Sequence, residues 1–89
     1  MDIEYTVQIW KEDDQFIAHA MPLDVVSSGS TAEEARAAVS EAVQLFLLTA
    51  KEAGTLEEVL REAGYQLRQD GWVSPNWVAI ERHSVLVEA

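Results

Sequence analysis

Histidine is the side chain best suited to proton transfer near neutral pH, and this chain has two, His19 and His83. Neither has a second histidine or an acidic residue at the spacing of a helical metal site. A metal pair or a catalytic dyad would therefore have to be assembled by the fold alone. We interpret His19, which lies in a β-rich run, as a half-buried, hydrogen-bonded residue. The sequence leaves the role of His83 open.

Two adjacent carboxylates, Asp13 and Asp14, are the next candidates for a metal site. A hard cation needs several converging oxygens, whereas this pair lies in a polar run, residues 11–15, that is typical of a solvated hairpin turn. The chain also has no cysteine, which excludes disulfides, thiolate nucleophiles and cysteine-ligated zinc. We therefore expect no bound metal.

The serine-rich segment 27–30 precedes a predicted helix, and a helix N-terminus can bind anions. Its spacing matches neither the nucleophile elbow of hydrolases nor a phosphate-binding loop. Glu33 and Glu34 would occupy the positive end of the helix dipole and repel a phosphate. We interpret the segment as a turn and helix cap. Because no inward cluster of carboxylates is evident in the strands either, we expect a non-enzymatic protein without a cofactor.

The overall charge further limits the functions that this chain can have. Sixteen acidic residues against six lysines and arginines give a net charge of -10, which would repel a nucleic-acid backbone. The acidic N-terminus does not resemble a signal peptide, and no apolar run is long enough to span a membrane. The sequence therefore predicts a cytoplasmic protein that binds neither nucleic acid nor membrane.

The first thirty residues predict strands. Ile3, Tyr5, Val7 and Ile9 alternate with polar residues, as in a strand with one buried face. A hairpin turn at residues 11–15 leads to a second strand over 16–21, and a third, short strand is expected over 25–28.

Two capping boxes predict the helices. Thr31 and Glu34 begin a long helix that ends at Gly54, although Ser30 and Glu33 could place the cap one residue earlier. Thr55 and Glu58 begin a shorter helix that ends at Gly64. The residues of the long helix expected to face the sheet are Ala35, Val39, Ala42, Val43, Phe46 and Ala50. Leu45 and Leu48 lie outside this stripe, and we expect the short helix to cover one of them.

The C-terminal quarter predicts an irregular bridge over 65–76 and a β-rich run over 77–87, whose alternation slips near residues 82–84. Together the elements predict a single α+β domain, residues 1–89. It would contain an antiparallel sheet of three N-terminal strands plus a C-terminal strand, with one long and one short helix packed on it.

Aromatic residues suggest an interface. Three tryptophans are a large number for so small a core, and tryptophan is enriched where proteins meet. A two-layer unit of this size also leaves a sheet face or edge exposed, which favours homo-oligomerisation. The residues expected at a partner or oligomer interface are Trp10, Asp13, Asp14, Leu48, Trp72 and Trp77.

Residues 3–50 resemble the HicB-like antitoxin family. The resemblance rests on three stretches, namely 16–23 (FIAHAMPL), 28–35 (SGSTAEEA) and 41–47 (EAVQLFL). It differs from the family at Asp24-Val25, where members commonly carry a proline-glycine step. Residues 65–89 also lack the C-terminal DNA-binding module of full antitoxins, so the chain is similar to short, stand-alone members.

The resemblance implies a partial ribonuclease H-like topology without the catalytic carboxylates. It also implies an oligomeric antitoxin-type protein that binds and masks a small basic HicA-like toxin ribonuclease. A charge of -10 would steer such a partner towards the chain, although it would equally keep a small protein soluble. The alternative is a stand-alone oligomeric scaffold or small-ligand binding domain with no toxin partner.

Overall fold

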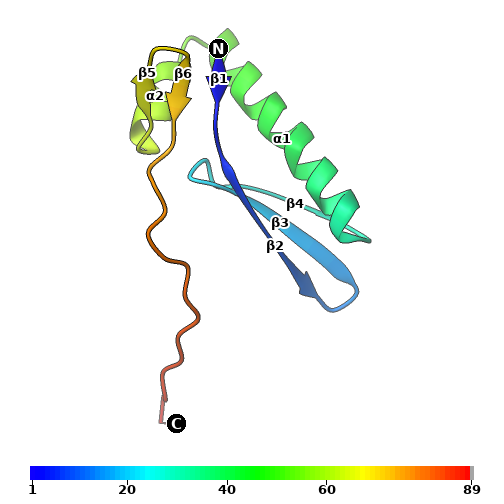
Figure 1. Cartoon of the computed structure of the whole chain (residues 1–89). Helices are drawn as coiled ribbons and strands as arrows, with labels where there is room; N and C mark the ends of the chain where they lie inside the picture. The colour runs from blue at the N-terminus through cyan, green and yellow to red at the C-terminus, as the bar shows by residue number, and fades with distance from the viewer. Residues whose placement is uncertain (89) are drawn as a thin grey trace.

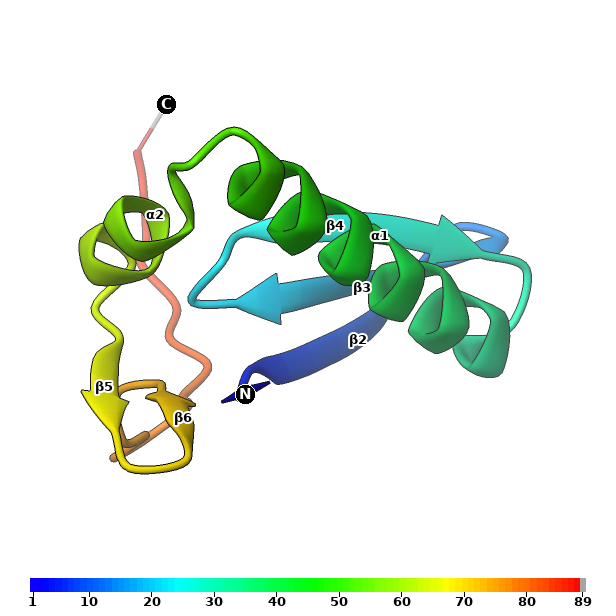
Figure 2. The ribbon, with the colours of Figure 1, turned by 90° about the horizontal axis from the view of Figure 1, so that it is seen from above.

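The protein is described by a computed structural model that covers residues 1–88 (Figure 1). This part of the chain contains two helices, one long and one short, and two three-stranded sheets. The predicted α+β class is confirmed. Figures 1 and 2 show the long helix lying across one face of the larger sheet, with the short helix and the smaller sheet at one end.

The larger sheet consists of β2 (Thr6–Glu12), β3 (Gln15–Met21) and β4 (Val25–Gly29), antiparallel and in that order. Ala18 pairs with Ile9 on one side and with Ser27 on the other, and it is fully buried. The three N-terminal strands are therefore where the alternation placed them, with one difference. The first is divided into β1 (Asp2–Ile3) and β2, because β1 pairs with a strand from the C-terminal part of the chain.

The long helix α1 (Ala32–Glu52) begins as its capping box predicts. The backbone N–H of Glu34 donates to Thr31 Oγ1 at 3.0 Å, and Glu34 Oε2 accepts from the backbone of Ser30 at 2.9 Å. Thr31 is thus the N-cap, and the alternative that starts the cap at Ser30 is wrong. Four predicted inward residues are buried, namely Ala35, Val39, Val43 and Ala50. Phe46 is exposed instead, because α1 lies mainly over β3 and β4 and its last turns extend beyond the sheet.

The short helix α2 (Leu56–Glu62) follows Gly54, whose φ of 75° is the left-handed conformation typical of a helix end. Its capping box does not form, since the hydroxyl of Thr55 donates backward to the carbonyl of Ala50. The expectation that α2 covers Leu45 or Leu48 is also wrong. Both side chains are exposed, because α2 directs Leu60 into the core beneath the smaller sheet.

The region expected to be an irregular bridge instead forms a hairpin of β5 (Gln66–Arg68) and β6 (Gly71–Val73). Strand β6 also pairs in parallel with β1, so the smaller sheet has the order β1-β6-β5. The N-terminal strand is thereby joined to residues 71–73, and Trp72 is brought into the core.

Tyr65 stabilises the contact between β1 and the C-terminal part of the body. Its side chain is buried, and its hydroxyl donates a hydrogen bond to the backbone carbonyl of Glu4. Burial raises the pKa of Tyr65 to about 12, with smaller contributions from Glu4 and Tyr5. The phenol therefore remains a neutral donor at any ordinary pH.

Residues 77–88, which we call the arm, are extended but form no strand within the described chain, so the C-terminal strand expected over 77–87 is not paired there. Figures 1 and 2 show the arm leaving the end of the molecule that carries α2 and β5–β6. We call residues 1–76 the body. No helix formed by residues 1–88 is long and apolar enough to cross a lipid bilayer.

Candidate interaction surface

The larger sheet has one covered face and one open face. Residues that face α1, such as Ala18 and Ala20, are fully buried, whereas their neighbours along β3 point the other way and are partly exposed. Strand pairing places apolar and aromatic side chains together on this second face, which we call the open face. Its members include Trp10, Ile17, His19, Met21 and Val26.

Three side chains form a cluster on the open face. His19 Nε2 lies 2.6 Å from Asp24 Oδ1, and the His19 ring meets Trp10 edge to face, with centroids 6.4 Å apart and an interplanar angle of 86°. The carboxylate fixes the orientation of the imidazole. No hydroxyl group in the described chain hydrogen-bonds to His19, so the pair lacks an activated nucleophile. His19 is half-buried and hydrogen-bonded, as predicted.

The acidic hairpin tip lies next to this cluster along β2. Asp13 has a φ of 52°, a left-handed conformation that aspartate tolerates in tight turns, and both Asp13 and Asp14 are exposed. Nowhere between residues 1 and 88 do three or more His, Cys, Asp or Glu side chains gather in a way that could hold a metal. The tip therefore presents concentrated negative charge beside Trp10, which is 40% exposed.

The other two tryptophans have different surroundings. Trp77 remains half-exposed at the start of the arm, where its indole Nε1 donates to Thr6 Oγ1 at 2.9 Å and its ring lines a small hollow with Pro22. Trp72 is only 5% exposed, with the Arg61 guanidinium 5.2 Å from its ring centre. The expectation that Trp72 serves an interface is wrong, because the β1·β6 pairing buries it.

Leu48 lies in an exposed apolar groove. Its side chain is 53% exposed and, with Leu47 and Leu56, lines a hollow between α1 and β1. A second apolar hollow of about 480 Å³ lies between α1 and α2. Both hollows are open because α1 extends beyond the sheet at its C-terminal end.

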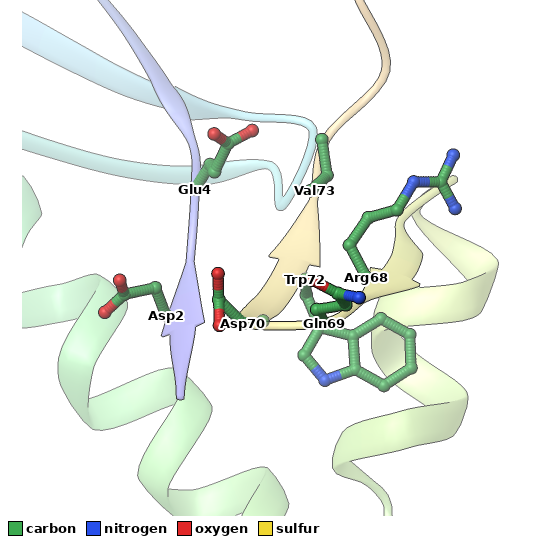
Figure 3. A pocket seen from close by; sticks show the side chains of 8 residues that line it. Asp2, Glu4, Arg68, Gln69, Asp70, Trp72 and Val73 are labelled. Carbon is green, nitrogen blue, oxygen red and sulfur yellow. The ribbon is translucent and has the colours of Figure 1, made fainter.

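A polar hollow of about 450 Å³ lies along the β1·β6 pair (Figure 3). Asp2, Glu4 and Asp70 contribute carboxylates, and Arg68 is the cation at its edge. Figure 3 shows the Arg68 side chain pointing away from these acids, and its guanidinium instead donates to Gln66 Oε1. The hollow thus carries net negative charge, in keeping with the rest of the surface. Sequence reasoning missed it, because its two walls lie far apart in the sequence.

The serine segment 27–30 forms the end of β4 and the turn that leads into α1. Gly29 ends β4 directly beneath the first turn of α1, and the backbone N–H of Ser30 is bonded to Glu34. This agrees with the interpretation as turn and cap.

The arm carries several of the most exposed apolar residues of the described chain. Val78 is 98% exposed and Leu86 is 89% exposed. His83 also lies in the arm, with Nε2 2.7 Å from Glu81 Oε1, and both side chains are exposed. Isolated exposed apolar residues are common, whereas exposed apolar residues gathered in one segment, as at 77–80 and 85–87, are typical of interaction sites.

No family model, no curated protein and no solved structure matches this chain.

Proposed function

We propose that this chain is a non-enzymatic binding protein of the HicB-like antitoxin type, which binds a small basic HicA-like toxin ribonuclease and masks it by occlusion. The proposal starts from the net charge of -10. Such a charge accelerates the approach of a cationic partner and disfavours direct contact with RNA. Apolar contacts would then hold the complex.

The observation that carries the proposal is the position of Trp10 beside the acidic hairpin tip. Interfaces between proteins combine an aromatic anchor with a polar rim, and here the anchor is already exposed and held against His19. Asp13 and Asp14 lie at the end of the same hairpin and are exposed. This surface suits a partner that presents lysines or arginines around an apolar patch.

The first experiment asks whether a partner exists. The gene beside the one that encodes this chain is examined for a short basic protein with a HicA-like histidine, and the two proteins are co-expressed and purified through a tag on one of them. We expect a stable complex in which cleavage of RNA by the partner is inhibited. Failure to form a complex with such a neighbour would remove the antitoxin proposal.

The second experiment locates the surface. D13N/D14N removes two charges from the hairpin tip, and asparagine tolerates the left-handed backbone at Asp13. The matched control E52Q/E58Q removes two charges from the distant ends of α1 and α2. We expect the tip variant to slow association with the partner by about 10-fold at low salt and the control to change it much less. Equal effects of the two variants would contradict a role for the tip.

A second candidate function is a stand-alone oligomeric scaffold or small-ligand binding domain. The observation that favours ligand binding is the apolar hollow between α1 and α2, which is lined by Leu45, Phe46 and Val59. A fluorescent apolar probe tests it. Saturable binding that L45K abolishes, in a chain that binds no basic protein, would favour this second function.

A further inference from the structure

The arm has the composition and conformation of a strand but lacks the neighbours of one. Its apolar residues are β-branched or aromatic at Trp77, Val78 and Ile80, and again at Val85 and Val87. Apolar residues occupy both faces of the extended chain over 77–80, which is typical of a strand buried on both sides. None of its backbone groups hydrogen-bonds to residues 1–76.

Beyond Trp77 the arm does not fold back on its own body. The radius of gyration is 15.4 Å, compared with about 12 Å for a compact chain of this length. Pro75 lacks the N–H that would continue the parallel pairing of β6 with the first strand. Two residues later the Trp77 indole is bonded to Thr6, and beyond this point the arm and β2 diverge (Figure 1).

The body offers one long strand edge that can accept another strand. Strand β2 is at the edge of the larger sheet, and among residues 1–88 nothing pairs with its outer side. It has seven residues, whereas β4 has five and β5 has three. The first turn of α1 crowds the end of β4 at Gly29, and α1 packs much less on β2 than on β4. Strand β2 is therefore the longest and least covered edge.

The arm is long enough to pair along β2 of another copy. A strand of seven residues is about 23 Å long, and residues 77–87 extend for about 36 Å, so part of the arm can pair along the whole of β2 while the rest connects it to its own body. A strand added there would lie beside Val7 and Ile9 on one face and beside Trp10 on the other. These neighbours suit the two apolar stretches of the arm, residues 77–80 and 85–87.

We propose that two copies of this chain exchange arms, so that the arm of each adds as a strand to the free edge of β2 in the other. The exchange buries the exposed apolar residues of both arms and satisfies the backbone groups of both edges. It is reciprocal, since each copy has one arm and one acceptor edge, and so it closes as a two-fold dimer. The proposal is independent of any toxin partner.

Sedimentation of the full chain at micromolar concentration tests the assembly. We expect twice the mass of the 9.9 kDa chain. V78K/I80K places two charges in the arm segment that would pair, and we expect it to weaken association by at least about 100-fold. The control L45K/L67K makes the same change at two exposed leucines of the body and should leave a dimer. A monomeric wild type, or a dimer that V78K/I80K leaves intact, would overturn the proposal.

Hydrogen exchange identifies the surface that holds the dimer. Amides of residues 78–86 are expected to exchange at least about 10-fold more slowly in the wild type than in V78K/I80K, together with amides of β2. Circular dichroism checks that the variant remains folded. A dimer whose arm amides exchange as in an unfolded chain would show that another surface joins the copies. Protected arm amides in a monomer would show that the arm folds on its own β2, and either result refutes the exchange.

Salt provides a third readout. Each copy carries a charge of -10, so the two bodies repel one another, and added salt screens this repulsion. We expect the dimer to become tighter as sodium chloride is raised. Weakening by salt would show that ion pairs hold the copies together, which contradicts assembly through apolar strands.

Discussion

The body and the arm contain the same kinds of residues in opposite surroundings. Val39 and Val43 are buried where α1 meets the sheet, whereas Val78 is 98% and Val87 79% exposed. The difference is that other segments of the chain pack against the valines of the body but not against those of the arm. The body pairs its strands and covers one sheet face, while the arm pairs with no strand of the described chain. Apolar composition thus indicates how much surface needs covering, and the fold determines whether the same molecule can cover it.

The comparison predicts where substitutions will matter, and the largest contrast concerns leucine. Leu60 is fully buried among core residues, and L60A should lower the free energy of unfolding by about 3 kcal/mol, because it removes packing and leaves a cavity. L86A changes an exposed arm residue and should alter the stability of the monomeric chain by less than about 0.5 kcal/mol. Urea unfolding at nanomolar concentration measures both. A similar loss in the free energy of unfolding for L60A and L86A would contradict the difference between the body and the arm.

The next contrast lies within the body and separates steric crowding from backbone conformation. A Cβ at Gly29 would lie 2.6 Å from the backbone nitrogen of Ala35, so G29A should cost about 2 kcal/mol by pushing α1 away from β4. At Gly54 a Cβ would meet nothing within 4 Å, and G54A should cost about 1 kcal/mol through its left-handed φ alone. Thermal unfolding compares them. The reverse order would contradict the close approach of α1 and β4.

Alkaline pH tests whether Tyr65 is buried beside β1, at the end of the body from which the arm leaves. Because the folded pKa of Tyr65 is about 12 and the ordinary value is 10.0, its contribution is complete below pH 10 and is lost as pH rises towards 12. By pH 11 the wild type should have lost about 1.4 kcal/mol more stability than Y65F, which cannot ionise. Chemical unfolding at neutral pH and at pH 11 gives the difference. Parallel pH profiles would show that Tyr65 is not buried.

The smallest expected effect compares the two helix starts. T31A removes the hydroxyl that accepts from Glu34 and should cost about 1 kcal/mol. T55A removes no capping bond, only the longer 3.3 Å hydrogen bond from the Thr55 hydroxyl to the Ala50 carbonyl, and should cost about 0.5 kcal/mol. Equal costs would show that the second capping box forms in solution.

Much of the body could be predicted from local signals. Period-two alternation located the strands of the larger sheet, and Thr31 with Glu34 located the start of α1, because these interactions span only a few residues. The hairpin of β5 and β6 was missed, since each strand has three residues and their stability comes from pairing with β1. A segment that short carries too little pattern to be recognised.

The role of the residues expected at an interface stays a prediction, and the structure shows only which of them are exposed. Trp10, Asp13, Asp14, Leu48 and Trp77 are exposed, as residues of an interface must be, whereas Trp72 is buried. Trp77 lies five positions after Trp72, and no local pattern shows which of the two the fold buries. The two differ because one falls in a strand that pairs with β1 and the other follows Pro75, where that pairing stops.

The sequence by itself determined the α+β class, the hairpin turn, the long helix with its cap and the acidic surface, because each depends on residues close together in the chain or on composition. Only the tertiary structure decided that the first strand joins β6, that Trp72 is covered and that the arm is not. Those outcomes depend on which distant apolar segments meet. Many pairings are possible between such segments, and the one that forms is the one in which backbone groups and side chains are satisfied together.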